Sequence, residues 1–225
     1  MVSPPVCLTP EYSRFFRGVA RNNHRAWYHA HKPAYDAHVR RPFEELVEEM
    51  IFRIGAADPS VRGLTPREAI FRLARDIRFT KDKTPYKLFS AAVIAPGGRK
   101  QSRAPGFYFE IGADRIGVAG GIYQPDKETL LRIRRAIASR GAELERLLAA
   151  PGFRRVFRAL QGERNVRLPP EFAPVAARHP LVAHRQFYYW VEHAGPLRGS
   201  VADFLMRHYR AGRPVSAWLA EAVAG

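Results

Sequence analysis

The chain has 225 residues, 46% of them hydrophobic, which is enough apolar material for one full core, so we predict a single domain over residues 1–225. The formal net charge of +16, from 37 Lys plus Arg against 21 Asp plus Glu, favours anionic partners. A lone cysteine, Cys7, excludes an internal disulfide and a cysteine-rich metal site, and no stretch approaches the roughly 18 apolar residues of a membrane span. We therefore expect a cytoplasmic protein without a membrane partner or a secretion signal.

The N-terminal region has the apolar spacing of helices. From Thr9 to Ile54 apolar residues recur at intervals of three and four, which predicts two or three helices. Thr9 followed by Pro10 is typical of a helix start, because threonine caps the first turn and proline fits within it. Pro, Gly and Asp between residues 56 and 64 predict a loop.

After this loop the apolar pattern changes to the alternation typical of strands. The predicted strands are Phe71–Leu73, Leu88–Ile94, Gly106–Ile111, Ile116–Tyr123 and Gln186–Glu192. A hairpin turn over Gly112–Arg115 would join the third and the fourth, which favours an antiparallel sheet. Residues 96–105 are rich in Gly, Pro and cations and predict a basic loop at a sheet edge.

The second half of the chain returns to helical spacing. The predicted helices are Pro125–Ser139, Ala142–Ala149, Pro151–Leu160, Val201–Tyr209 and Val215–Ala224. The proline-rich segment Leu168–Pro180 is predicted to wrap the surface. Together the elements predict an α+β fold, a mainly antiparallel sheet covered by N-terminal and C-terminal helices.

One segment of sixteen residues, 72–87, is unusually dense in charge. Its cations are Arg72, Arg75, Arg78, Lys81, Lys83 and Lys87. Arginine presents a planar fork and lysine a mobile point charge, so this mixture suits a phosphate group. The alternative is a structural network, in which Asp76 and Asp82 pair with neighbouring cations and hold the loop together.

The same segment resembles the signature of a bacterial family, domain of unknown function 2461, which reads R-x-x-R-D-x-R-F followed by D-K-x-P-Y-K. Further similarity lies in two regions of the chain, namely Phe15, Phe16, Asn22, Asn23, Trp27, Lys32 and Tyr35, and Gly121–Pro125 with Leu131 and Arg134. The resemblance covers most of the chain. It implies that one fold extends over most of the chain and that the charged motif has the boundaries of the family signature. It implies no established activity.

The candidate site residues come from this segment and from an N-terminal polar cluster. The predicted ligand-binding residues are Arg72, Arg75, Arg78, Lys83, Lys87, Asn22, Asn23 and Trp27. For the two asparagines the alternative is a helix cap and turn. Asp76, Asp82 and Tyr86 are candidates for ligand orientation or proton transfer. The histidine spacings match no standard metal site, so we predict no metal.

The leading functional hypothesis is the binding of a phosphate-bearing ligand, such as a nucleotide or sugar phosphate, in a cationic pocket formed by residues 72–87. Phosphoryl or nucleotidyl chemistry would suit such a clamp, but no nucleophile and base pair is evident, so enzymatic activity stays open and no cofactor is indicated.

Two alternatives use other features of the chain. The first is a nucleic-acid-binding module that uses diffuse charge, from Arg99, Lys100, Arg103, Arg132, Arg135, Arg154, Arg155 and Arg158. The second is a structural or protein-interaction domain. Salt dependence separates the first alternative from a phosphate pocket, because binding through many phosphates weakens steeply with salt.

Overall fold

A computed structural model describes residues 9–100, 104–195, 197 and 199–225 of the chain. Cys7 and Arg103 lie outside the described residues. The helices are α1 (Pro10–Arg21), α2 (Arg25–Ala30), α3 (Lys32–Tyr35), α4 (Arg41–Gly55), α5 (Pro66–Ala69), α6 (Lys127–Ala149), α7 (Pro151–Phe157), α8 (Ala173–Arg178) and α9 (Val201–Ala224). None of the helices in the described part of the chain combines the length and apolarity needed to cross a bilayer.

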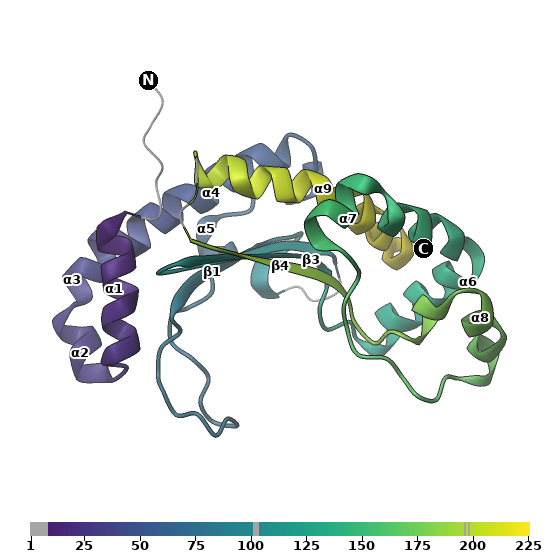
Figure 1. The fold of residues 1–225 in the computed structure, drawn as a ribbon, viewed down its shortest axis with the longest axis horizontal. Coiled ribbons are helices and arrows are strands. Elements are labelled where there is room, and N and C mark those ends of the chain that lie inside the picture. Colours follow the sequence, from purple (N-terminus) through teal and green to yellow (C-terminus); the bar gives the residue numbers. More distant parts are fainter. Residues whose placement is uncertain (1–8, 101–103, 196, 198) are drawn as a thin grey trace. The chain divides into compact units, whose positions relative to one another are not determined.

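The strands form one antiparallel sheet in the order β1-β2-β3-β4 (Figure 1). Their bounds are β1 (Phe89–Ile94), β2 (Gly106–Gly112), β3 (Arg115–Ile122) and β4 (Phe187–Ala194). The α+β prediction and the short turn between β2 and β3 are therefore confirmed. The chain divides into two compact units, and β2, β3, β4 and α9 contribute residues to both.

The first unit contains residues 1–99, 108–117 and 192–206. Its first helix begins as the sequence predicts, because the Thr9 side chain accepts a hydrogen bond from the Tyr12 amide at 3.2 Å. A π-helical turn, Asp36–Arg40, joins α3 to α4 directly before Pro42. Proline has no backbone N–H to donate in the hydrogen-bond pattern of an α-helix, and a π-helical turn is one way for the helix to continue past a proline.

Strand β2 has two different faces in the first unit. Phe109 lies 5.8 Å from Phe43 of α4, measured between ring centroids, and the Ile111 carbonyl accepts a hydrogen bond from the Tyr12 hydroxyl at 3.0 Å. Since side chains alternate along a strand, Tyr108 and Glu110 belong to the opposite face. This second face carries the polar cluster described below.

The predicted strand Phe71–Leu73 is not one of the regular strands. Residues 70–74 run beside β1 in an irregular ribbon, with single bridges from Ile70 to Ala92 and from Ala74 to Tyr86. The two bridges are out of register with each other by two residues, so a continuous ladder cannot form. The prediction found the extended backbone but not its irregular pairing.

The second unit contains residues 100–107, 118–191 and 207–225. Its core includes the buried Tyr189 of β4, whose ring contacts Phe157 of α7 at 4.4 Å between centroids. A Cβ atom at Gly120 or at Gly212 would lie 2.2 Å from the Tyr189 hydroxyl oxygen, so glycine is needed on both sides of this ring. The hydroxyl itself lies 2.8 Å from that of Ser216.

The structure joins two predicted helices into α9 and adds detail to two other predictions. Helix α6 spans residues 127–149, and its backbone is non-helical at Arg140, so the break predicted between residues 139 and 142 is present as a kink. Helix α9 continues through Pro214, because Val215 and Leu219 beyond it are fully buried and their packing offsets the lost backbone bond. Segment 168–180 contains α8, since Pro174 falls in its first turn, where proline is tolerated.

Candidate functional site

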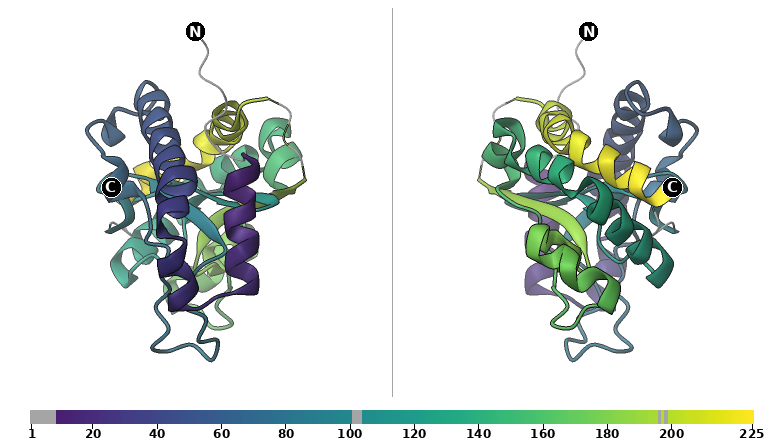
Figure 2. Two further views of the ribbon diagram at one scale, coloured as in Figure 1. Left: turned by 90° about the vertical axis from the view of Figure 1, so that its left-hand side faces the viewer. Right: turned by 90° about the vertical axis from the view of Figure 1, so that its right-hand side faces the viewer.

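Residues 75–85 form a basic hairpin that extends away from β1 as a long blue loop (Figures 1 and 2). Its base is closed by a hydrogen bond from the Arg75 amide to the Pro85 carbonyl at 2.8 Å. The Arg75 guanidinium donates to Asp82 and Thr84. Arg78 pairs with Asp76 at 2.7 Å, and Lys83 donates to the Ile77 carbonyl at 2.8 Å. Most charged side chains of the hairpin are therefore paired with other groups of the same hairpin.

The two carboxylates of the hairpin stay ionised. Hydrogen bonds from Arg78 lower the pKa of Asp76 to about 2. The Thr84 amide and then the Arg75 side chain lower the pKa of Asp82 to about 2. Groups with such a low pKa are poor proton donors near neutral pH. These contacts match the structural network that was the alternative to a phosphate site in the sequence analysis.

The N-terminal cluster contacts the same segment through Asn23. Its side-chain amide donates to the Tyr86 carbonyl at 2.9 Å, and its side-chain oxygen accepts from the Tyr86 amide at 3.0 Å. Asn22 donates to the Gly18 carbonyl at the end of α1, and so it caps that helix. Trp27 stacks on His31 with ring centroids 4.0 Å apart. Tyr86 is buried, and its ring stacks on Tyr28.

A second group of polar side chains lies on the β2 face that is opposite Phe109. Glu110 is only 8% exposed, although it carries a carboxyl group. Its oxygens are held by the Tyr108 hydroxyl at 2.7 Å and by the Arg115 guanidinium at 3.4 Å. Arg115 also pairs with Glu192 of β4 at 2.6 Å. Buried carboxyl groups usually need such partners.

Two cations of the segment 72–87 complete what we call the Glu110 cluster, which consists of Arg72, Lys87, Tyr108, Glu110, Arg115 and Glu192. The Lys87 ammonium lies 5.2 Å from the ring centroid of Phe71, and the Phe71 ring contacts Tyr108. The Arg72 guanidinium is exposed and acts electrostatically on Lys87. Within the described part of the chain, neither cation has a hydrogen bond or an ion pair from its charged group.

The protonation of this cluster differs from that of exposed groups. Burial raises the pKa of Glu110, which the Tyr108 hydrogen bond and the Arg115 charge partly oppose. Burial also lowers the pKa of Lys87, and the charge of Arg72 lowers it further, while Glu110 opposes this shift. Both groups are therefore shifted toward their neutral forms, as is common for acids and bases in functional sites.

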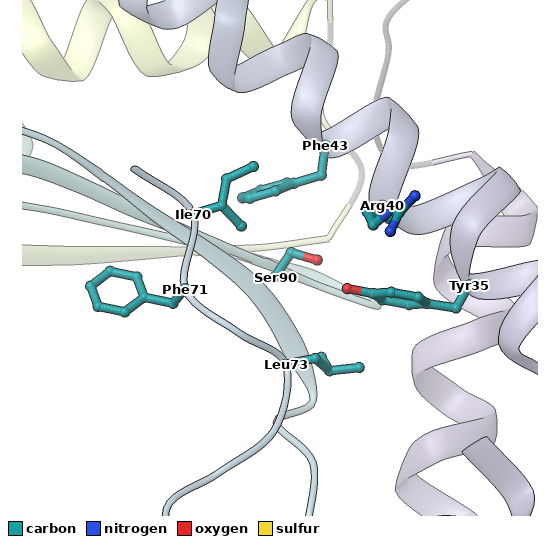
Figure 3. A pocket seen from close by; sticks show the side chains of 7 residues that line it. All are labelled: Tyr35, Arg40, Phe43, Ile70, Phe71, Leu73 and Ser90. Carbon is teal, nitrogen blue, oxygen red and sulfur yellow. The ribbon is translucent and has the colours of Figure 1, made fainter. Parts of the chain in front are cut away.

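A small pocket lies on the opposite side of residues 70–73, towards α4. It is lined by Tyr35, Arg40, Phe43, Ile70, Phe71, Leu73 and Ser90 (Figure 3). The hydroxyl ends of Tyr35 and Ser90 point toward each other, and Arg40 is the single charged residue of the lining. The cavity volume of about 20 Å³ suits about one water molecule. The cations of segment 72–87 do not line it.

Four members of the Glu110 cluster were missed by the sequence analysis, namely Tyr108, Glu110, Arg115 and Glu192. One signal was available, because Glu110 interrupts an otherwise apolar and aromatic strand, Gly106–Ile111. A carboxylate in such a strand usually lies on the solvent side, so the pattern alone does not indicate burial.

The cations of the nucleic-acid alternative are spread over several elements. Arg99 donates to the Arg67 carbonyl, and Arg132 pairs with Glu128 at 2.9 Å. The remaining described members are exposed, and they are Lys100, Arg135, Arg154, Arg155 and Arg158. Over the described residues, no group of three or more His, Cys, Asp or Glu side chains is arranged to hold a metal ion.

Comparison with known proteins identifies a family. Residues 11–218 match the family described as conserved hypothetical protein, domain of unknown function 2461, so the chain belongs to that family. This confirms the resemblance to the family. No curated protein matches the chain. Because the family description names no activity, any functional argument depends on the residues of the chain itself.

Proposed function

We propose that the protein binds a phosphate-bearing small molecule, such as a nucleotide or a sugar phosphate, at the Glu110 cluster. The observation that carries the proposal is the pair Arg72 and Lys87. The two cations lie close enough to affect each other, and within the described chain neither has a hydrogen bond or an ion pair from its charged group. A phosphate could accept hydrogen bonds from the guanidinium and the ammonium together.

The burial of Lys87 supports a ligand role over a purely structural one. The half-buried Lys87 ammonium has the Phe71 ring and the charge of Glu110 nearby but no hydrogen bond to replace lost water, which is unfavourable for folding. A bound anion would reverse this deficit. Side chains kept at a cost to stability are typical of binding sites.

The proposed site is narrower than the pocket expected from the sequence. Arg75, Arg78 and Lys83 have partners inside the basic hairpin, so an anion would have to displace those contacts to reach them. Arg72 and Lys87 need no such displacement. Glu110 adds a chemical option, because the neutral carboxyl group favoured by burial can donate a proton or a hydrogen bond to a phosphate oxygen.

A melting-temperature screen tests the proposal. Wild-type protein is heated with inorganic phosphate, nucleotides, sugar phosphates and short oligonucleotides. Binding at a hundred times the dissociation constant stabilises the folded state by about 2.7 kcal/mol, which corresponds to a rise in Tm of roughly 5–10 °C for a chain of this size. We expect such a rise with a small phosphorylated ligand, and its loss in Arg72→Ala and Lys87→Met.

Matched controls separate the site from general charge. Arg14→Ala and Lys127→Met each remove one exposed cation elsewhere, and they should keep the ligand-induced rise in Tm. A rise that Arg72→Ala and Lys87→Met also keep would overturn the proposed site. A different result would favour nucleic-acid binding through diffuse charge. In that case only oligonucleotides would raise the Tm, both variants would keep the rise, and salt would remove it.

A further inference from the structure

The tip of the basic hairpin exposes an aromatic ring. Phe79 is 93% exposed, although burying a phenylalanine side chain usually stabilises a protein by about 1.5–3 kcal/mol. Its recorded contact is with the neighbouring Arg78, whose guanidinium lies 5.4 Å from the ring centroid. The ring therefore adds little to the fold, and its position calls for another explanation.

The hairpin holds its form without Phe79. Its internal contacts join Arg75 to Asp82 and Lys83 to the Ile77 carbonyl, and Asp82 also accepts from the Thr84 amide at 2.9 Å. These contacts lie on both sides of the tip and fix the backbone that carries the ring. A ring presented on a fixed loop loses little conformational freedom when it binds a partner.

The charges around the tip favour an anionic partner. Arg78 directly precedes Phe79, and Lys81 and Lys83 follow within four residues. Lys81 is exposed and has no recorded hydrogen bond or ion pair within the described part of the chain. The whole chain has a formal charge of +16, which would attract a polyanion over a longer range.

From these observations we infer that the hairpin tip binds single-stranded nucleic acid. The Phe79 ring stacks on an unpaired base, and the exposed Lys81 contacts a phosphate beside that base. Arg78 and Lys83 contact the neighbouring phosphates by exchanging their exposed contacts with Asp76 and the Ile77 carbonyl. Proteins that bind single strands without sequence preference combine cations along the backbone with aromatic side chains on which bases stack, and the hairpin tip presents one such ring with cations on both sides. A lipid bilayer fits less well, because the residues next to Phe79 are polar or charged and offer no wider apolar surface.

This inference does not depend on the proposed phosphate site. It uses residues 78–83 of the hairpin, whereas the phosphate site uses Arg72, Lys87 and the sheet. It also differs from diffuse binding, because it assigns the aromatic contact to one side chain. Each proposal can therefore fail without the other.

Fluorescence polarisation with a labelled single-stranded oligonucleotide of mixed sequence tests the inference on the full chain. Phe79→Ala should raise the dissociation constant roughly 5- to 150-fold, the range found when a stacking aromatic is removed. Phe79→Trp should keep wild-type affinity. Phe52→Ala is the matched control, because Phe52 is an 81% exposed phenylalanine on α4, and this variant should bind like wild type.

A second probe isolates the stacking contact. A strand of the same length without bases should bind wild type and Phe79→Ala equally, since only phosphate contacts remain. The inference is overturned if Phe79→Ala binds the oligonucleotide like Phe52→Ala, or if wild type does not bind it. It is also overturned if Phe79 matters for anionic lipid vesicles and not for the oligonucleotide. Because Phe79 is exposed, Phe79→Ala should melt like wild type, which excludes misfolding as the cause.

Discussion

Glu110 is a buried carboxyl group whose ionisation should affect stability. Its pKa is raised in the folded state, chiefly by burial, so the folded protein keeps this proton at pH values where the unfolded chain has released it. The stabilising effect of the group is complete below about pH 4.5, its usual pKa, and is lost as the pH rises through the folded-state pKa.

Replacement of this carboxyl group should remove that pH dependence. Relative to Glu110→Gln, the wild-type free energy of unfolding should fall above about pH 4.5, by at most about 1.4 kcal/mol per pH unit. Urea denaturation of both proteins over a pH series measures the difference. A constant difference across the series would show that Glu110 has no raised pKa.

Tyr108→Phe gives an independent check on the same carboxyl group. The Tyr108 hydroxyl donates to Glu110 and favours its charged form, so losing that bond should raise the pKa of Glu110 further. The fall in stability should then extend to higher pH than in wild type. If the fall instead moved to lower pH, the hydrogen bond would not be acting on the charged carboxylate.

At the same scale, the sequence reveals residue types more readily than their surroundings. Segment 72–87 stands out in the sequence by its charge, and the structure brings its Lys87 close enough to Glu110 of β2 for the two charges to act on each other. Its pattern does not show that Arg75 and Arg78 find partners in the hairpin, because that depends on where the chain reverses. The burial of Glu110 was also hidden, since its neighbours Lys87 and Arg115 come from other segments.

At the scale of elements, Asn23 joins the turn after α1 to the segment that leads into β1. It makes two hydrogen bonds to the backbone of Tyr86, in a partly buried position. Asn23→Ala should leave both backbone groups without these bonds and lower the free energy of unfolding by about 1–3 kcal/mol. Chemical denaturation measures this loss, and amide hydrogen exchange at Tyr86 should become faster.

Asn22→Ala is the matched control for this prediction. Asn22 donates to the Gly18 carbonyl, but that carbonyl also accepts the Asn22 backbone amide at 3.0 Å, so it stays satisfied when the side chain is removed. We expect a smaller loss, below about 1 kcal/mol, and unchanged exchange at Tyr86. Equal effects of the two variants would mean that Asn23 does not join these elements.

The elements themselves were predicted well where local signals decide them. The cap at Thr9, the strand β2 and the hairpin turn after Gly112 all depend on neighbouring residues, and each is present. Errors arose where distant packing outweighs a local break, as at Pro214, whose helix continues because the residues beyond it are buried. A local sequence pattern cannot show which residues are buried by packing against distant segments.

At the scale of the whole molecule, the formal charge of +16 makes salt dependence the sharpest test of how nucleic acid would bind. If the hairpin tip alone contacts phosphates, through about three cations, a plot of log affinity against log salt concentration should have a slope of about −2. A small phosphorylated ligand at Arg72 and Lys87 should show a shallow dependence, since few counterions are released. Oligonucleotide titrations at several salt concentrations between about 50 and 200 mM measure this slope.

The slope also shows whether charge outside the hairpin takes part. Diffuse binding of a single strand through six to ten phosphates, with a slope of about −0.7 for each phosphate, would lower the affinity roughly 300- to 16,000-fold over that salt range, far more than three contacts can. Triple replacement of Arg154, Arg155 and Arg158, exposed cations of α7 and the residue that follows it, should then make the slope shallower, whereas under hairpin binding it should leave the slope unchanged. A steep slope, together with an affinity that Phe79→Ala does not lower, would assign nucleic-acid binding to the general charge of the molecule and not to the hairpin.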